Sequence, residues 1–200
     1  HDQYMGAVVV DIGAGTTDVA RLYGTFPNED DEFTVAEAGD WLDLQLMDMI
    51  EKKYTGAQLT KDMVRAWKEE FSYVGGNDDE CMVELSVEGK KNVVDIGDIV
   101  REGCEMLIPH VVGAIKTIIA SADPEYQPQF RNNIILSGGG SMIDGIAEMV
   151  ADQLADIRSQ ASKQLTKRYS ADKNAISFLS ELSLNQASPL PVRLDAITTL

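Results

Sequence analysis

Residues 8–18 join a short apolar strand to a turn whose composition suits a bound phosphate. The segment reads Val-Val-Val-Asp-Ile-Gly-Ala-Gly-Thr-Thr-Asp, with two glycines and two threonines in the turn. Glycines let backbone N–H groups approach an anion closely, and threonine hydroxyls add further donors. The pattern continues as a strand after Asp18, so we expect a hairpin that binds phosphate without a helix N-terminus. The candidate phosphate-binding residues are Gly13, Ala14, Gly15, Thr16 and Thr17.

Asp11 lies at the end of the predicted strand, directly before this turn. Mg²⁺ prefers carboxylate, water and phosphate oxygens, so Asp11 is placed to hold a water or a divalent cation against the phosphates. Asp11 is the candidate catalytic residue and the candidate ligand of Mg²⁺ through water. The segment has neither the Gly-Lys-Ser/Thr ending of a P-loop nor a G-x-G-x-x-G motif before a helix. The alternative is a β-hairpin whose glycines only turn the chain.

The composition limits the class of protein. The chain has 200 residues, 44% of them hydrophobic, which is enough for one domain or two small lobes. Seventeen basic against 33 acidic residues give a net charge of −16, which argues against nucleic acid as a partner. The two cysteines have no motif spacing, and we expect them reduced in a cytoplasmic protein. We identify no apolar run long enough to span a bilayer, and both chain ends indicate a fragment of a longer protein.

Hydrophobic periodicity predicts alternating strands and helices. Strands are expected at 6–13, 16–24, 32–38, 81–87, 92–94 and 133–136, and helices at 40–54, 60–74, 98–122 and 142–157. Thr60 and Asp98 are predicted N-caps, and Pro109 is expected to kink or split the third helix.

A second candidate binding segment follows the strand at 133–136. Gly138, Gly139, Gly140 and Ser141 form a strand-to-helix turn in which three successive residues lack side chains. A flat or bulky group can lie directly on such a backbone, and the N–H groups at the helix start can meet an anion or a ribose. The alternative is a flexible turn.

A third candidate lies on the helix expected at 60–74. Trp67 and Phe71, at positions i and i+4, are expected to face the core, which leaves Lys68 and Glu69 on an adjacent exposed face. The alternative is a charged face that is simply solvated.

Together these segments resemble the actin, Hsp70 and sugar-kinase superfamily of ATPases. The hairpin, the run from Lys68 to Gly75 and the run from Asn133 to Ser141 are most similar to bacterial actin-like proteins of the MamK and MreB group, over about residues 5–157. The resemblance implies the second half of an α/β actin-like ATPase fold: a five-stranded mixed sheet with flanking helices and a small inserted α+β subdomain. Residues 5–56 and 95–157 would form the inner nucleotide-binding subdomain, 57–94 the outer subdomain, and 158–200 a divergent C-terminal segment.

The resemblance also implies a function. ATP or ADP and Mg²⁺ would bind between two halves, with Lys68 and Glu69 over the adenine and ribose and the run from Gly138 to Ser141 as the adenosine loop. Subunits would stack head to tail into a cytoplasmic filament that organises magnetosomes, with magnetosome-associated linker proteins as further partners. The first-half phosphate loop and the water-positioning residue are absent from this sequence, so ATPase activity is left open. A non-catalytic scaffold module and an MreB-like cell-shape filament protein are the alternatives; the short outer subdomain makes an Hsp70-like ATPase less favoured.

Overall fold

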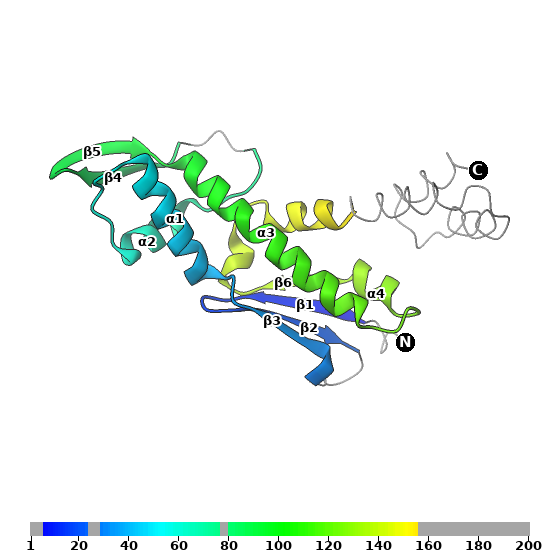
Figure 1. Cartoon of the computed structure of the whole chain (residues 1–200). Helices are drawn as coiled ribbons and strands as arrows, with labels where there is room; N and C mark the ends of the chain where they lie inside the picture. Colours follow the sequence, from blue (N-terminus) through cyan, green and yellow to red (C-terminus); the bar gives the residue numbers. More distant parts are fainter. Residues whose placement is uncertain (1–5, 24–28, 77–79, 156–200) are drawn as a thin grey trace, which may run out of the picture. The chain divides into compact units, whose positions relative to one another are not determined.

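The structure is a computed structural model that describes residues 6–23, 29–76 and 80–155. Its centre is a mixed sheet with the strand order β3-β2-β1-β6 (Figure 1). The four strands are β1 (Ala7–Ile12), β2 (Thr17–Leu22), β3 (Glu32–Val35) and β6 (Ile134–Ser137). The described residues thus supply four strands of the expected mixed sheet.

Strand register brings two loops to the same end of this sheet. β1 runs antiparallel to β2, with Asp11 opposite Asp18, and parallel to β6, with Asp11 opposite Ser137. Alternate β1 side chains (Val8, Val10) are fully buried, as expected for a strand with one face on a helix layer. The loop after β1 and the loop after β6 are therefore neighbours, as in other parallel strand pairs.

Helices α1 (Gly39–Lys53) and α3 (Gly97–Ala120) pack against each other, and α3 also packs on the sheet (Figure 1). The two helices approach most closely at Gly103, where a Cβ would lie 2.5 Å from Cδ2 of Leu46. The short helix α4 (Gln127–Asn132) lies beside β1 and the end of α3.

By length and composition alone, α3 could cross a membrane: it has 24 residues and contains an 18-residue window that is sufficiently apolar. The expectation that no segment is long and apolar enough is therefore wrong for α3. More than half of its residues are buried within the fold, which is the pattern of a core helix.

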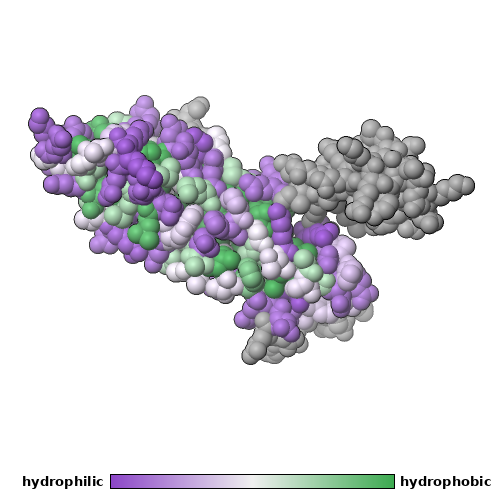
Figure 2. Space-filling view, in the orientation of Figure 1, coloured by the Kyte–Doolittle hydropathy of each residue, from purple (hydrophilic) through white to green (hydrophobic). Residues whose placement is uncertain are grey.

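A smaller layer lies beyond α1. It consists of α2 (Lys61–Phe71) and a hairpin of β4 (Met82–Val87) and β5 (Lys90–Asp95). The hairpin turns at Glu88 and Gly89, both with positive φ, as a two-residue turn requires. Hydrophilic side chains cover much of the visible surface over α1 and this hairpin (Figure 2). The described residues up to Met149 pack as one compact unit. This unit is not divided at residues 57 and 94, so these boundaries of the outer subdomain stay a prediction.

Several local expectations hold and others do not. Thr60 caps α2 as predicted, its Oγ1 accepting from the amide of Met63 at 3.2 Å. Both cysteine side chains are buried, and neither is in a disulfide. Pro109 does not split α3, which is continuous from Gly97 to Ala120, with buried apolar residues on both sides of the proline. A kink at Pro109 stays a prediction.

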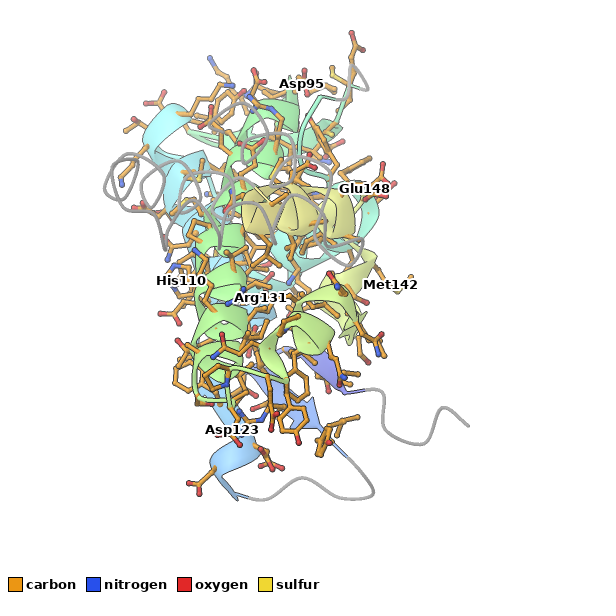
Figure 3. The ribbon with its side chains drawn as sticks, turned by 90° about the vertical axis from the view of Figure 1, so that its right-hand side faces the viewer. Asp95, His110, Asp123, Arg131, Met142 and Glu148 are labelled. Atoms are coloured by element: carbon orange, nitrogen blue, oxygen red, sulfur yellow. The ribbon has the colours of Figure 1, made fainter. Side chains whose placement is uncertain are left out.

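The prediction of Asp98 as the cap of α3 is wrong. The carboxylate that accepts from the amide of Gly97 belongs to Asp95, at 2.9 Å, and it also accepts from the amide of Cys81 at 3.0 Å. Asp98 lies in the first turn and pairs with Arg101. Asp95 therefore links the start of α3 to the residue before β4. Asp95 and Asp123 are labelled near the two ends of α3 in Figure 3.

The helix expected at 142–157 begins later. A 3₁₀ turn (Gly139–Met142) follows β6, and residues 146–155 are helical. Gly145 has a φ of +77°, and Asp144 pairs with the backbone of Tyr73, so the chain leaves the turn before the helix starts. Residues 158–200 lie outside the described residues.

Candidate functional site

The first candidate segment forms the hairpin between β1 and β2. The amide of Gly13 donates to the carbonyl of Thr16 at 2.9 Å, which closes the turn over Ala14 and Gly15. Among the described residues, the amides of Ala14, Gly15 and Thr16 have no protein acceptor. The turn therefore presents consecutive N–H groups, as a phosphate-binding hairpin requires.

Threonine side chains hold the hairpin from behind. Thr17 is fully buried, and its Oγ1 donates to the carbonyl of Glu37 at 2.7 Å. Asp18 accepts from Thr16 at 2.8 Å and from Thr34 on β3 at 2.6 Å. The hydroxyl of Thr17 thus anchors the turn to the backbone, while phosphate binding by Thr17 stays a prediction.

The start of α1 lies against this hairpin. That phosphate binds in the hairpin without the helix N-terminus stays a prediction. The amides of Gly39 and Asp40 donate to the carbonyls of Gly13 and Ala14, at 3.0 and 2.7 Å. These first N–H groups of the helix fix the turn. The positive end of the α1 dipole consequently lies beside the hairpin.

The second candidate segment packs directly on the first. Gly138 has a φ of +79°, and a Cβ there would overlap Oδ1 of Asp11 and lie 2.5 Å from the carbonyl oxygen of Ile12. A Cβ on Gly140 would overlap the side chain of Ile12. The hydroxyl of Ser141 donates to the carbonyl of Gly138 at 2.7 Å and closes the turn. Two of the three glycines are thus required by contact with the end of β1.

At two other positions in these loops, no contact within the protein requires a glycine. Gly15 and Gly139 would each carry a Cβ with no heavy atom within 4 Å, and neither has a positive φ. Neither turn geometry nor packing among the described residues requires glycine at these positions. Their backbones are open to a group from outside, one in each loop. Met142, at the end of the second loop, extends outward and is 83% exposed (Figure 3).

The two residues of the third candidate, Lys68 and Glu69, lie in different surroundings. Lys68 lies on α2 with its side chain 13% exposed, and its Nζ donates to the carbonyl of Gly39 at 2.9 Å. The same Nζ lies 2.5 Å from Oδ1 of Asp43. Glu69 is exposed. Lys68 therefore reaches the start of α1 beside the hairpin.

The expectation that Trp67 and Phe71 face the core is only partly right. Both are half-buried, and the fully buried apolar residue of α2 is Val64. Helix α2 contacts α1 and, less extensively, α3.

The chain after α2 ties this helix to the glycine-rich loop. The amide of Val74 donates to the carbonyl of Asp144 at 2.9 Å, and the amide of Asp144 donates to the carbonyl of Ser72 at 3.2 Å. The three candidate segments are thus joined by backbone hydrogen bonds or direct packing.

Charged residues between α1 and α2 form a network that sequence reasoning missed. Asp40 pairs with Lys61 at 3.2 Å and with Arg65 at 2.7 Å. The hydrogen bond from Lys61 lowers the pKa of Asp40, and the hydrogen bond to Asp43 raises the pKa of Arg65. The sequence signal was a pair of acids three positions apart on α1, Asp40 and Asp43, opposite a basic stripe on the next helix.

Within the described residues, no group of three or more His, Cys, Asp and Glu side chains is arranged to hold a metal ion. Asp11 is an exposed carboxylate at the open end of β1, opposite the exposed Asp18 of β2. Mg²⁺ in nucleotide sites is commonly held by one or two carboxylates together with phosphate oxygens, so this donor set fits a metal that arrives with a nucleotide.

Comparison with known proteins identifies what this arrangement resembles. The family model described as MreB/Mbl protein matches residues 2–167. The actin-like protein MamK of Magnetospirillum gryphiswaldense is 37% identical over 153 residues, which covers 76% of this chain and 42% of that protein.

Two solved structures are similar in both sequence and fold. A MamK double helical filament has a TM-score of 0.71 at 36% identity, covering 76% of this chain and 46% of that one. A non-polymerising MamK mutant bound to AMPPNP has a TM-score of 0.70 at 37% identity, covering 75% and 46%. The chain therefore spans less than half the length of these relatives.

Proposed function

Because the chain belongs to the MreB/Mbl family of bacterial actin-like proteins, we propose that it is the nucleotide-binding half of an ATP-dependent filament protein of the MamK type. The nucleotide would be ATP or ADP, bound with Mg²⁺. The solved MamK mutant bound to AMPPNP supports a nucleotide of this class.

The observation that carries the proposal is the pair of open glycines, Gly15 and Gly139. They lie in two loops that the register of β1 with β2 and β6 places at one end of the sheet. One loop presents unpaired amides, which suit phosphate oxygens, and the other presents bare backbone, which suits a flat adenosine.

Each candidate residue has a proposed role. The hairpin amides of Ala14, Gly15 and Thr16 bind phosphate oxygens, with Gly13 and Thr17 holding the turn. Asp11 binds Mg²⁺ through water; the metal supplies charge neutralisation for the phosphates. The adenosine contacts come from a set of residues in the other two segments: Lys68, Glu69, Gly138, Gly139, Gly140 and Ser141.

Hydrolysis needs groups from outside this chain. Phosphoryl transfer depends on positioning from all sides of the phosphate, and the chain covers less than half of its relatives. We therefore propose that this chain forms one wall of the nucleotide site and that its own turnover is slow.

Filament formation is part of the same proposal. A head-to-tail contact joins two different surfaces and does not close, so it generates a polymer. The similar MamK filament structure supports self-assembly of this kind. A cytoplasmic filament, its association with magnetosomes and contact with magnetosome-associated linker proteins follow as proposals from the same relatives.

Calorimetric titration of the chain with ATP and Mg²⁺ tests the proposal. One-to-one binding with a dissociation constant at or below about 1 mM, which is about −4.1 kcal/mol, is the expected result. Absence of heat at millimolar ATP, with the chain folded by circular dichroism, would favour a non-catalytic scaffold module that keeps the fold without the ligand.

A further inference from the structure

Asp43 is the one charged residue that is fully buried in the part of the chain that the structure describes. It lies on the apolar face of α1, between the buried Leu42 and Leu46. A carboxylate in such a position is costly unless it is paired, so its partners indicate why it is there.

Both partners of Asp43 come from α2. Nζ of Lys68 lies 2.5 Å from one carboxylate oxygen, and Nε of Arg65 lies 3.3 Å from the other. Lys68 also donates to the carbonyl of Gly39, one helical turn before Asp43, at 2.9 Å. One ammonium group therefore bridges the acid and the first residue of α1.

Gly39 continues this connection to the hairpin. Its amide donates to the carbonyl of Gly13 at 3.0 Å. A Cβ on Gly39 would lie 3.2 Å from that carbonyl oxygen and 3.5 Å from Nζ of Lys68, so the three groups are closely packed. The contacts run from Asp43 through Lys68 and Gly39 to the phosphate-binding turn.

Fold stability alone does not account for this arrangement. Replacing a buried ion pair by apolar residues of similar volume is often neutral or stabilising, and the neighbours of Asp43 on this face are leucines. A buried ion pair does, however, fix one relative position of two elements more narrowly than apolar contact does.

We propose that Asp43 is a positioning residue of the nucleotide site: its buried carboxylate holds the Lys68 ammonium on the Gly39 carbonyl and so sets α2 against the phosphate hairpin. This inference rests on the proposed function. Since the ammonium is occupied by two protein acceptors, Lys68 faces the ligand with its methylene stem and not with its charge. Asp43 then affects the adenosine end of the ligand through Lys68 and the phosphate hairpin through Gly39.

The test compares Asp43→Asn, Lys68→Met and the double variant, each titrated with adenosine and with ADP and Mg²⁺. The control is Asp48→Asn, which removes an exposed ion pair with Lys52 on the same helix. We expect Asp43→Asn to weaken adenosine by about tenfold and ADP by at least the same factor. The double variant should bind no more weakly than Lys68→Met, because the two residues act through one contact. Normal binding by folded Asp43→Asn, additive losses, or a loss confined to ADP would each overturn the inference.

A second measurement needs no ligand. Hydrogen exchange at the amides of Gly39 and Asp40 should be faster by about fivefold in both Asp43→Asn and Lys68→Met, and unchanged in Asp48→Asn. Unchanged exchange at these two amides would contradict the positioning role, whatever the titrations give. If the unmodified chain binds neither adenosine nor ADP, the proposed function fails while this exchange measurement still decides the role of Asp43. Lys68→Met leaves Asp43 paired with Arg65, so it serves if Asp43→Asn does not fold.

Discussion

Oδ1 of Asp11 occupies the space that a side chain on Gly138 would need. The proposed metal ligand and the first residue of the glycine-rich loop are therefore in direct contact, although 126 positions separate them in the chain. The contact follows from the parallel pairing of β1 and β6, which places Asp11 beside Ser137. It makes the phosphate hairpin and the second loop a single structural unit.

Gly138→Ala is expected to lower the free energy of unfolding by about 2–4 kcal/mol, because the added Cβ meets both Asp11 and the Ile12 backbone at a positive φ. Urea denaturation measures this change. Gly139→Ala is the matched control: its Cβ enters open space, so stability should stay within about 0.5 kcal/mol of the original. Equal destabilisation by the two substitutions would contradict the described packing.

Asp11→Asn is expected to remove the contribution of Mg²⁺ to ATP binding while leaving the fold intact, since Asp11 is exposed. Titrations with ATP in the presence of Mg²⁺ and of EDTA measure that contribution. In a full-length protein, Asp11→Ala should abolish hydrolysis without necessarily preventing assembly. Asp98→Asn, an exposed carboxylate at the start of α3, is the control. A Mg²⁺ effect of normal size in Asp11→Asn would show that the metal is held elsewhere.

Thr17→Val keeps the shape of a buried side chain and removes its hydroxyl. The carbonyl of Glu37 then loses its donor, so the free energy of unfolding should fall by about 1–3 kcal/mol. Thermal or urea unfolding measures the loss, with the exposed Thr55→Val as comparison. A change no larger than that of Thr55→Val would mean that Thr17 does not anchor the hairpin.

Burial raises the pKa of the Cys104 thiol to about 12. The unfolded thiol ionises near pH 9 and the folded one does not, so the free energy of unfolding should fall as pH rises from about 9 towards 12, by at most about 1.4 kcal/mol per pH unit. Urea denaturation from pH 7 to 10.5 measures this slope. Cys104→Ala should be less stable at pH 7 but show a shallower decline; an identical slope would contradict the assignment.

Local features were predictable from sequence because they depend on neighbouring residues. The hairpin after β1 and the Thr60 cap follow from glycines, hydroxyls and strand periodicity within a few positions. The sequence pattern does not predict helix α4, because it is short, has a proline in its first turn and has no capping side chain. The cap of α3 was assigned to Asp98 because a cap normally directly precedes the helix, whereas Asp95 reaches the Gly97 amide from two residues away.

Hydrophobic periodicity and local motifs did not predict the contacts between segments that are distant in the sequence. The buried Asp43 lies on a face that otherwise reads as apolar, and its partners Arg65 and Lys68 are 22 and 25 positions away. The helical phase of Lys68 predicts exposure, while the tertiary contact with α1 buries it. The second loop was recognised from its glycines, but the packing of Gly138 on Asp11 required the strand register.

The central claim is that three separated segments form one nucleotide site. Backbone amide shifts of the chain, followed by NMR during titration with ATP and Mg²⁺, test it most directly. The account predicts that shifts at residues 13–17, 68–69 and 138–141 change together with one dissociation constant, while Asp95 to Asp98, which repeats the Asp-Ile-Gly sequence, does not respond. Changes confined to one segment, or different constants for different segments, would contradict a single site.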